Sequence, residues 1–198
     1  MVLADGHEPQ VTLQILEAFP EARSVVDAGT YRESTYEVAR AVDYLVCSED
    51  FARQYTGEPL ADPDDVHATD ELLRRIEGIN DGVAVVTLGD RGLIFRDDEG
   101  TPQHMPAFAA HAVDTTGAGD IFHGAFAFGL YQNMPLEDNL RMCSMTSSLS
   151  VRSMGALTSI PTMSRCSRSS PRHVNMEKRP AYRNGLRIWR GGEHNERT

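Results

Sequence analysis

The chain has 198 residues, of which 40% are hydrophobic and 24% charged, a composition that indicates a folded domain and excludes wholesale disorder. No apolar run approaches the ~18 residues that a membrane-spanning helix needs, and the start lacks a basic region, so we expect no membrane span and no signal peptide. The three cysteines (Cys47, Cys143 and Cys166) are scattered, which favours a reducing cytoplasm over a disulfide framework or a zinc site.

Charge divides the chain in two. Residues 163–198 contain 9 basic and 3 acidic residues, a net charge of +6, whereas residues 1–162 contain 10 basic and 26 acidic residues, a net charge of −16. An acidic body repels nucleic acid and anionic membranes, so neither is an expected partner. We predict a folded core at 1–162 and a basic, disordered tail at 163–198. The alternative is that the tail is an arm for nucleic acid or an acidic partner.

Strand and helix patterns alternate along the predicted core. Ser48 suits a helix N-cap and Gly57 a helix end, and the continuous apolar run at 83–88 is typical of a strand covered on both faces. The expected strands cover 1–4, 24–27, 44–47, 83–88, 92–96 and 111–113, and the expected helices cover 9–20, 34–40, 48–57, 66–76, 119–132 and 136–152. This alternation predicts an α/β fold, a three-layer α/β/α sandwich around a largely parallel sheet.

One segment carries most of the chemical information, namely Asp114-Thr115-Thr116-Gly117-Ala118-Gly119-Asp120-Ile121-Phe122-His123-Gly124-Ala125-Phe126. Its pattern predicts a strand into Asp114, a turn with two glycines and then a helix. Such a turn gathers free backbone N–H groups at a helix N-terminus, which suits an anion such as phosphate. Asp120 lies at the mouth of this site, either as a first-turn acid favoured by the helix dipole or as a catalytic base. His123 lies one residue outside the apolar stripe, so we expect it to be solvated; the alternative is that it approaches the site.

The full segment closely resembles the C-terminal signature of the ribokinase-like (PfkB-type) carbohydrate kinases, D-T-x-G-A-G-D-x-F-x-G-A-F. Weaker similarities flank it in the family's order over residues 1–162. These are the V-D strand end at Val26-Asp27, the T-G helix end at Thr56-Gly57, the T-x-G-x-x-G turn from Thr87 to Gly92, and the closing G-A-x-x-x-I-P from Gly155 to Pro161.

The resemblance implies an ATP-dependent phosphotransferase that acts on a hydroxyl of a sugar or sugar-like molecule. The residue that matches the catalytic base is Asp120, and Gly117, Ala118 and Gly119 match the anion hole. Nucleotide contacts fall on Thr87, Gly89, Gly92 and Thr115. Mg²⁺ is implied with ATP, held mostly through phosphates and water. Many members also bind a monovalent cation such as K⁺, whose ligands would fall on Asp114, Thr116, Ser150, Gly155 and Ser159.

The sequence departs from the family pattern in two ways. The N-x-x-E motif that helps to order Mg²⁺ would fall on Ser48 and Phe51, and the acids Glu49 and Asp50 are out of register. Family members also place about their first third, with the sugar-binding glycine motif and the β lid, before the point that matches residue 1. We therefore expect an N-terminally truncated ribokinase-like core whose uncovered sheet edge favours association of copies.

Three functions remain open from the sequence. The first is the kinase, with Asp120 as its base. The second is a truncated, non-catalytic remnant that still binds nucleotide. The third is an interaction protein that binds through its basic tail.

Overall fold

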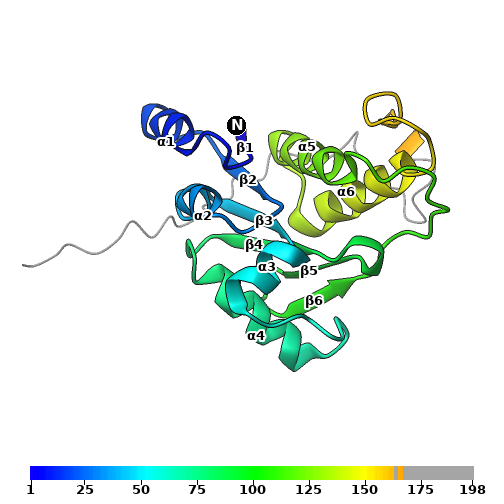
Figure 1. Cartoon of the computed structure of the whole chain (residues 1–198), viewed down its shortest axis with the longest axis horizontal. Helices are drawn as coiled ribbons and strands as arrows, with labels where there is room; N and C mark the ends of the chain where they lie inside the picture. Colours follow the sequence, from blue (N-terminus) through cyan, green and yellow to red (C-terminus); the bar gives the residue numbers. More distant parts are fainter. Residues whose placement is uncertain (163–164, 167–198) are drawn as a thin grey trace, which may run out of the picture.

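The computed structural model describes residues 1–162 and 165–166, so most of the tail at 163–198 lies outside the described residues. Figure 1 shows the arrangement of its helices and strands. In chain order they are β1 (Val2–Ala4), α1 (Pro9–Ala18), β2 (Ser24–Ala28), α2 (Glu33–Ala39), β3 (Tyr44–Ser48), α3 (Glu49–Thr56), α4 (Val66–Glu77), β4 (Val83–Thr87), the 3₁₀ turn η1 (Gly89–Arg91), β5 (Leu93–Arg96), β6 (Pro102–Met105), α5 (Ala118–Tyr131) and α6 (Leu136–Ser150).

The six described strands form one sheet in the order β1-β2-β3-β4-β5-β6. The first four are parallel, with Asp27 of β2 opposite Val46 of β3 and Ser48 of β3 opposite Thr87 of β4. β5 and β6 then run antiparallel to their neighbours. Because parallel strands end at the same edge, the residues that follow β2, β3 and β4 meet there, and this is where α/β proteins bind ligands.

Alternate residues of the strands enter two separate cores, as a sheet covered on both faces requires. On one face, Val26, Leu45 and Val86 pack with side chains of α2, α3 and α4. On the other face, Val46 and Val85 pack with α5 and α6, which lie together on that side of the sheet (Figure 1). The predicted three-layer sandwich with a largely parallel sheet is therefore confirmed.

Local capping explains several boundaries that the sequence predicted. The Ser48 hydroxyl accepts a hydrogen bond from the Phe51 amide at 3.0 Å and caps α3, and Gly57 ends this helix in the left-handed conformation with φ of 81°. The Asp65 carboxylate accepts hydrogen bonds from His67 and Ala68 at the start of α4.

Two local predictions were wrong. Residues 111–113 form no strand, because the Val113 and Asp114 amides donate instead to the carbonyl of Val151 just after α6. The last strand is β6, which pairs with β5 despite its polar sequence. The apolar residues of α1 and its end are only partly buried. Leu16 packs against the core, whereas Val11, Ile15 and Phe19 are exposed.

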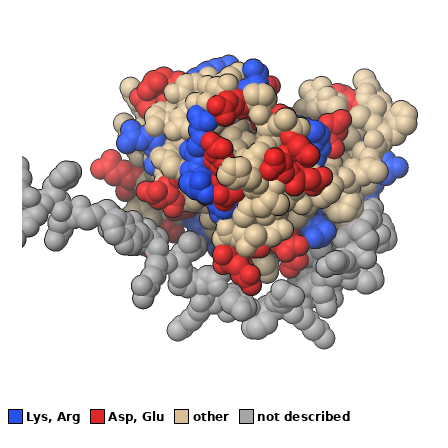
Figure 2. Space-filling view, turned by 90° about the horizontal axis from the view of Figure 1, so that it is seen from below, with Lys and Arg blue, Asp and Glu red and all other residues tan. Residues whose placement is uncertain are grey.

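Charged side chains are spread over the described surface. On the face seen in Figure 2, acidic groups are interspersed with arginines and do not form one continuous patch. Within the described part of the chain, the helices are too short or too polar to span a membrane.

Candidate active site

The 117–120 turn begins α5 and has the backbone geometry that its glycines predict. Gly117 precedes the helix in the left-handed conformation, with φ of 73°, and a side chain there would meet the Ala156 Cβ at 2.8 Å. The first N–H groups of a helix have no intrahelical acceptor. The Ala118 amide donates to the Thr115 carbonyl at 3.1 Å, whereas the Gly119 and Asp120 amides have no acceptor within the described residues. Of the predicted anion hole, the Ala118 amide is thus bound within the turn, whereas the Gly119 amide is open to a ligand.

Asp120 is in the first turn of α5 and is exposed. Its carboxylate makes no hydrogen bond or ion pair with any residue of 1–162 or 165–166, although Asp27 lies close enough to feel its charge. A first-turn acid also interacts favourably with the helix dipole without any partner, so both roles that the sequence left open fit this position. The Asp120 carboxylate is free to accept a proton or a hydrogen bond from a ligand.

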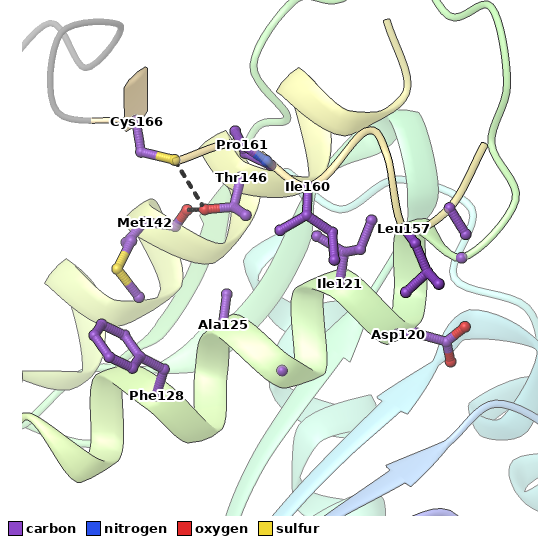
Figure 3. A pocket seen from close by; sticks show the side chains of 13 residues that line it. Asp120, Ile121, Ala125, Phe128, Met142, Thr146, Leu157, Ile160, Pro161 and Cys166 are labelled. Carbon is purple, nitrogen blue, oxygen red and sulfur yellow. Dashed lines mark hydrogen bonds between the residues drawn. The ribbon is translucent and has the colours of Figure 1, made fainter. Parts of the chain in front are cut away.

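A cavity of about 470 Å³ opens beside Asp120, between α5, α6 and the segment after α6. Figure 3 shows Asp120 and Leu157 at one end of the lining, with Phe128 and Met142 at the other. The residues that line it are Gly117, Asp120, Ile121, Gly124, Ala125, Phe128, Met142, Thr146, Ala156, Leu157, Ile160, Pro161 and Cys166. Its size and mostly apolar lining are typical of small-molecule sites.

Asp114 joins the loop before α5 to the loop after α6. One carboxylate oxygen accepts a hydrogen bond from the Thr116 amide at 2.9 Å, and the other accepts one from the Gly155 amide, also at 2.9 Å. These backbone donors, Gly155 first, hold the pKa of the Asp114 carboxyl below its ordinary value. The structure thus brings together three of the five residues predicted to bind a cation.

The other two predicted cation ligands use their hydroxyls locally. Ser150 Oγ donates to the Ser147 carbonyl at 2.7 Å, and Ser159 Oγ donates to the Ala156 carbonyl at 3.1 Å. Both residues are buried close to the Asp114–Gly155 junction along the chain. The donor set of this region is one carboxylate with hydroxyl and carbonyl oxygens, which fits a hard cation in its chemistry.

The predicted nucleotide contacts lie in two places. Thr87 ends β4 at the carboxyl edge of the sheet, and its hydroxyl donates to the Cys47 carbonyl at 3.3 Å. Gly89 begins η1 and Gly92 ends it with φ of 98°, where a side chain would meet the Met105 carbonyl at 2.1 Å. Gly92 thus allows β6 to approach closely. Thr115 lies at the second place, the 117–120 turn, where its carbonyl accepts a hydrogen bond from the Ala118 amide.

Arg91 anchors η1 and was not singled out by the sequence. Its guanidinium contacts a Glu49 carboxylate oxygen at 2.5 Å and donates to the Leu60 carbonyl at 3.0 Å. The two positions that match N-x-x-E have structural roles here, since Ser48 caps α3 and Phe51 is fully buried. The out-of-register Glu49 therefore holds Arg91 in place.

His123 is buried, which corrects the expectation of a solvated position. Only 5% of the residue is exposed. Its ring lies between α5 and the carboxyl ends of β2 and β3, where Nδ1 is 3.1 Å from the Asp27 carboxylate and Nε2 is 3.2 Å from the Val46 carbonyl. Its place in the helix gave no signal of this, because the partners come from strands about 80 and 100 residues earlier in the chain.

Several known proteins are similar to this chain. The model for the pfkB family of carbohydrate kinases matches residues 14–163. The ribokinase of Lactococcus lactis is 37% identical over 133 residues, which are 67% of this chain and 40% of that protein. The ribokinase of Mus musculus is 41% identical over 119 residues, 58% of this chain and 36% of that protein. The chain spans about two fifths of the length of these curated relatives.

Solved structures show the same fold. The ribokinase of Thermotoga maritima matches with a TM-score of 0.65 at 26% identity, over 83% of this chain and 54% of that one. The ribokinase of Arabidopsis thaliana, solved in complex with ribose and ATP, matches with a TM-score of 0.70 at 24% identity, over 83% of this chain and 53% of that one.

Proposed function

The chain belongs to the pfkB family of carbohydrate kinases, and from this premise we propose that it transfers the γ-phosphoryl group of ATP to a hydroxyl of a sugar or sugar-like substrate. In this proposal Asp120 is the general base that takes the proton of the attacking hydroxyl. The amides of the 117–120 turn stabilise the negative charge on the transferred phosphoryl group.

The observation that carries the proposal is the free Asp120 carboxylate beside free amides at the α5 N-terminus. Phosphoryl transfer depends mainly on positioning and on electrostatic stabilisation of the phosphate oxygens. The helix dipole and unpaired N–H groups supply that stabilisation at a fixed place. A carboxylate without another partner, in the same turn, is available for the proton of the acceptor hydroxyl.

The neighbouring cavity supports a nucleotide as the phosphoryl donor. A nucleotide has an apolar, aromatic base and an anionic phosphate chain. The cavity offers an apolar lining whose one acidic residue is Asp120, and it begins at the 117–120 turn. The Arabidopsis thaliana ribokinase, which is similar in fold, was solved with ATP in its complex. We infer that the base lies toward the apolar lining and the phosphates lie toward the turn.

Two kinds of cation fit the proposal. When bound with ATP, Mg²⁺ neutralises charge on the phosphates. Ser48 and Phe51 stand where the family motif has Asn and Glu, so this chain lacks the acid of that motif. Mg²⁺ would therefore be coordinated mainly by phosphates and water. K⁺ would be held by oxygens of the Asp114–Gly155 junction, whose Asp114 lies just before the 117–120 turn, and would keep the two loops together.

The direct test is acceptor-dependent ADP release by the 198-residue chain with ATP, Mg²⁺ and K⁺, across a panel of sugars and nucleosides. We expect Asp120→Asn to retain ATP binding and to lose at least the ~10²-fold typical of general base catalysis. The matched control is Asp98→Asn, an exposed acid in the 97–100 turn. No turnover with any acceptor, from folded protein that binds ATP, would overturn the proposal and favour a nucleotide-binding remnant.

A further inference from the structure

The ring of His123 connects the 117–120 turn to two strands of the sheet. Nδ1 lies 2.8 Å from the Gly119 carbonyl oxygen and 3.1 Å from an Asp27 carboxylate oxygen. Nε2 lies 3.2 Å from the Val46 carbonyl oxygen. Gly119 belongs to the turn itself, whereas Asp27 and Val46 are opposite each other at the carboxyl ends of β2 and β3. One side chain therefore ties the start of α5 to the edge of the sheet.

The partners of the ring indicate which protons it carries. A carbonyl oxygen can only accept a hydrogen bond, so bonds to Gly119 and Val46 require an N–H on each ring nitrogen. A neutral imidazole has one N–H, and an imidazolium has two. The Asp27 carboxylate beside Nδ1 provides the opposite charge that a buried cation requires.

Other charges near this pair are acidic. Burial is the main cause that raises the pKa of the Asp27 carboxyl, the His123 charge opposes that rise, and the charges of Asp120 and Asp5 add to it. Two further carboxylates, one on α5 and one after β1, thus add negative charge around Asp27. A cation at His123 offsets this concentration of negative charge just behind the place where phosphate is proposed to bind.

We propose that His123 is a positioning residue, held as an imidazolium by Asp27, that fixes the 117–120 turn against β2 and β3 and adds a positive charge behind its anion site. The charge has the same sign as the helix N-terminus and so favours an anion at the turn. This inference rests on the proposed function only in taking the bound anion to be the phosphates of ATP. The protonation and the anchoring are properties of the free protein.

The first experiment measures the protons directly and needs no activity. In ¹⁵N-detected NMR spectra of the histidine rings at pH 7.5, with the His123 signals assigned by their loss in His123→Gln, we expect both nitrogens to be protonated. In Asp27→Asn we expect a neutral ring at the same pH. A single neutral tautomer in the unmodified chain would overturn the proposal, even if the protein is an active kinase.

The second experiment measures anion binding by calorimetry with ATP as the probe. We expect His123→Gln to bind ATP about fivefold more weakly, the size of effect typical of one charge at a helix N-terminus. His67→Gln, an exposed histidine on α4, is the control and should not change affinity.

Asp27→Asn provides an independent variant if His123→Gln does not fold. Where His123→Gln does fold, the double variant tests whether the two residues act as a pair. If they do, its ATP affinity should equal that of the single variant with the lower affinity. Equal ATP affinities in the unmodified chain and in folded His123→Gln would contradict the proposed charge. If the unmodified chain binds ATP but shows no turnover, the proposed function fails, whereas the inference about His123 is still decided by the ATP affinities.

Discussion

Asp114 and Gly155 are 41 residues apart in the sequence and are joined by a 2.9 Å hydrogen bond from the Gly155 amide to the Asp114 carboxylate. The same carboxylate holds the Thr116 amide with its other oxygen. The bond fixes the loop that enters the 117–120 turn to the segment that lines the cavity. This junction and the packing around α5 have four measurable consequences.

Replacing Asp114 by Asn should weaken the junction. An amide side chain presents an N–H₂ group to one of the two backbone donors that the carboxylate now satisfies. We expect ATP affinity to fall by about tenfold, as for loss of a charge-assisted hydrogen bond, together with a lower melting temperature. Calorimetry and thermal unfolding measure both, with Asp98→Asn as a control for charge. An unchanged affinity in both variants would show that the junction does not support binding.

Acid should release the same junction. The pKa of Asp114 is lowered from 3.8 by its backbone donors, so the folded state prefers the charged form. The contribution of Asp114 to stability is therefore complete above pH 3.8 and is lost as the pH falls through the lower folded value. Protection of the Gly155 amide against exchange, taken relative to the intrinsic rate at each pH, should fall in this window. In Asp114→Asn that protection should already be low at pH 5.

Gly117→Ala should destabilise the turn in two ways. Its φ of 73° costs an L-residue about 1–2 kcal/mol, and the new Cβ would lie 2.8 Å from that of Ala156. We expect a loss of about 1–3 kcal/mol in urea unfolding and weaker ATP binding. Gly78→Ala at the end of α4, where φ is −62° and the nearest atoms are 3.5 Å away, is the matched control. A loss of equal size in both would refute the strain at Gly117.

Gly129→Ala should loosen the contact between α5 and α6. A Cβ at Gly129 would lie 1.9 Å from Oδ1 of Asn139, a fully buried side chain that donates to the Phe126 carbonyl at 3.0 Å. Ala gains about 1 kcal/mol in helix propensity, but overpacking costs about 1–3 kcal/mol and the hydrogen bond is strained as well. We expect a net destabilisation in urea unfolding. Gly124→Ala on the same helix, with no atom within 4 Å of its Cβ, should instead stabilise. If Gly129→Ala also stabilises the protein, the Asn139 side chain can move away from the new Cβ without cost.

Local patterns sufficed where a residue's role depends on its sequence neighbours. The cap at Ser48, the helix end at Gly57 and the turn at Gly117 were predicted because each depends on backbone geometry within a few residues. The three layers were predicted from the order of strands and helices, which can also be read along the sequence. The motif around Asp120 predicted the family, which the comparison over residues 14–163 confirms. The roles of Asp120 and the cation ligands stay predictions.

Tertiary structure alone decided the features that depend on distant partners. Residues 111–113 have the sequence of a strand, but the Val113 amide donates to the Val151 carbonyl after α6 instead. Residues 102–105 form the strand β6 because β5 lies beside them. Likewise, His123 looks solvated in a helix pattern, yet it is buried because Asp27 and Val46 surround it with acceptors. A polar side chain or a backbone group takes the environment where its hydrogen bonds are satisfied, and those partners are set by how the chain folds back on itself.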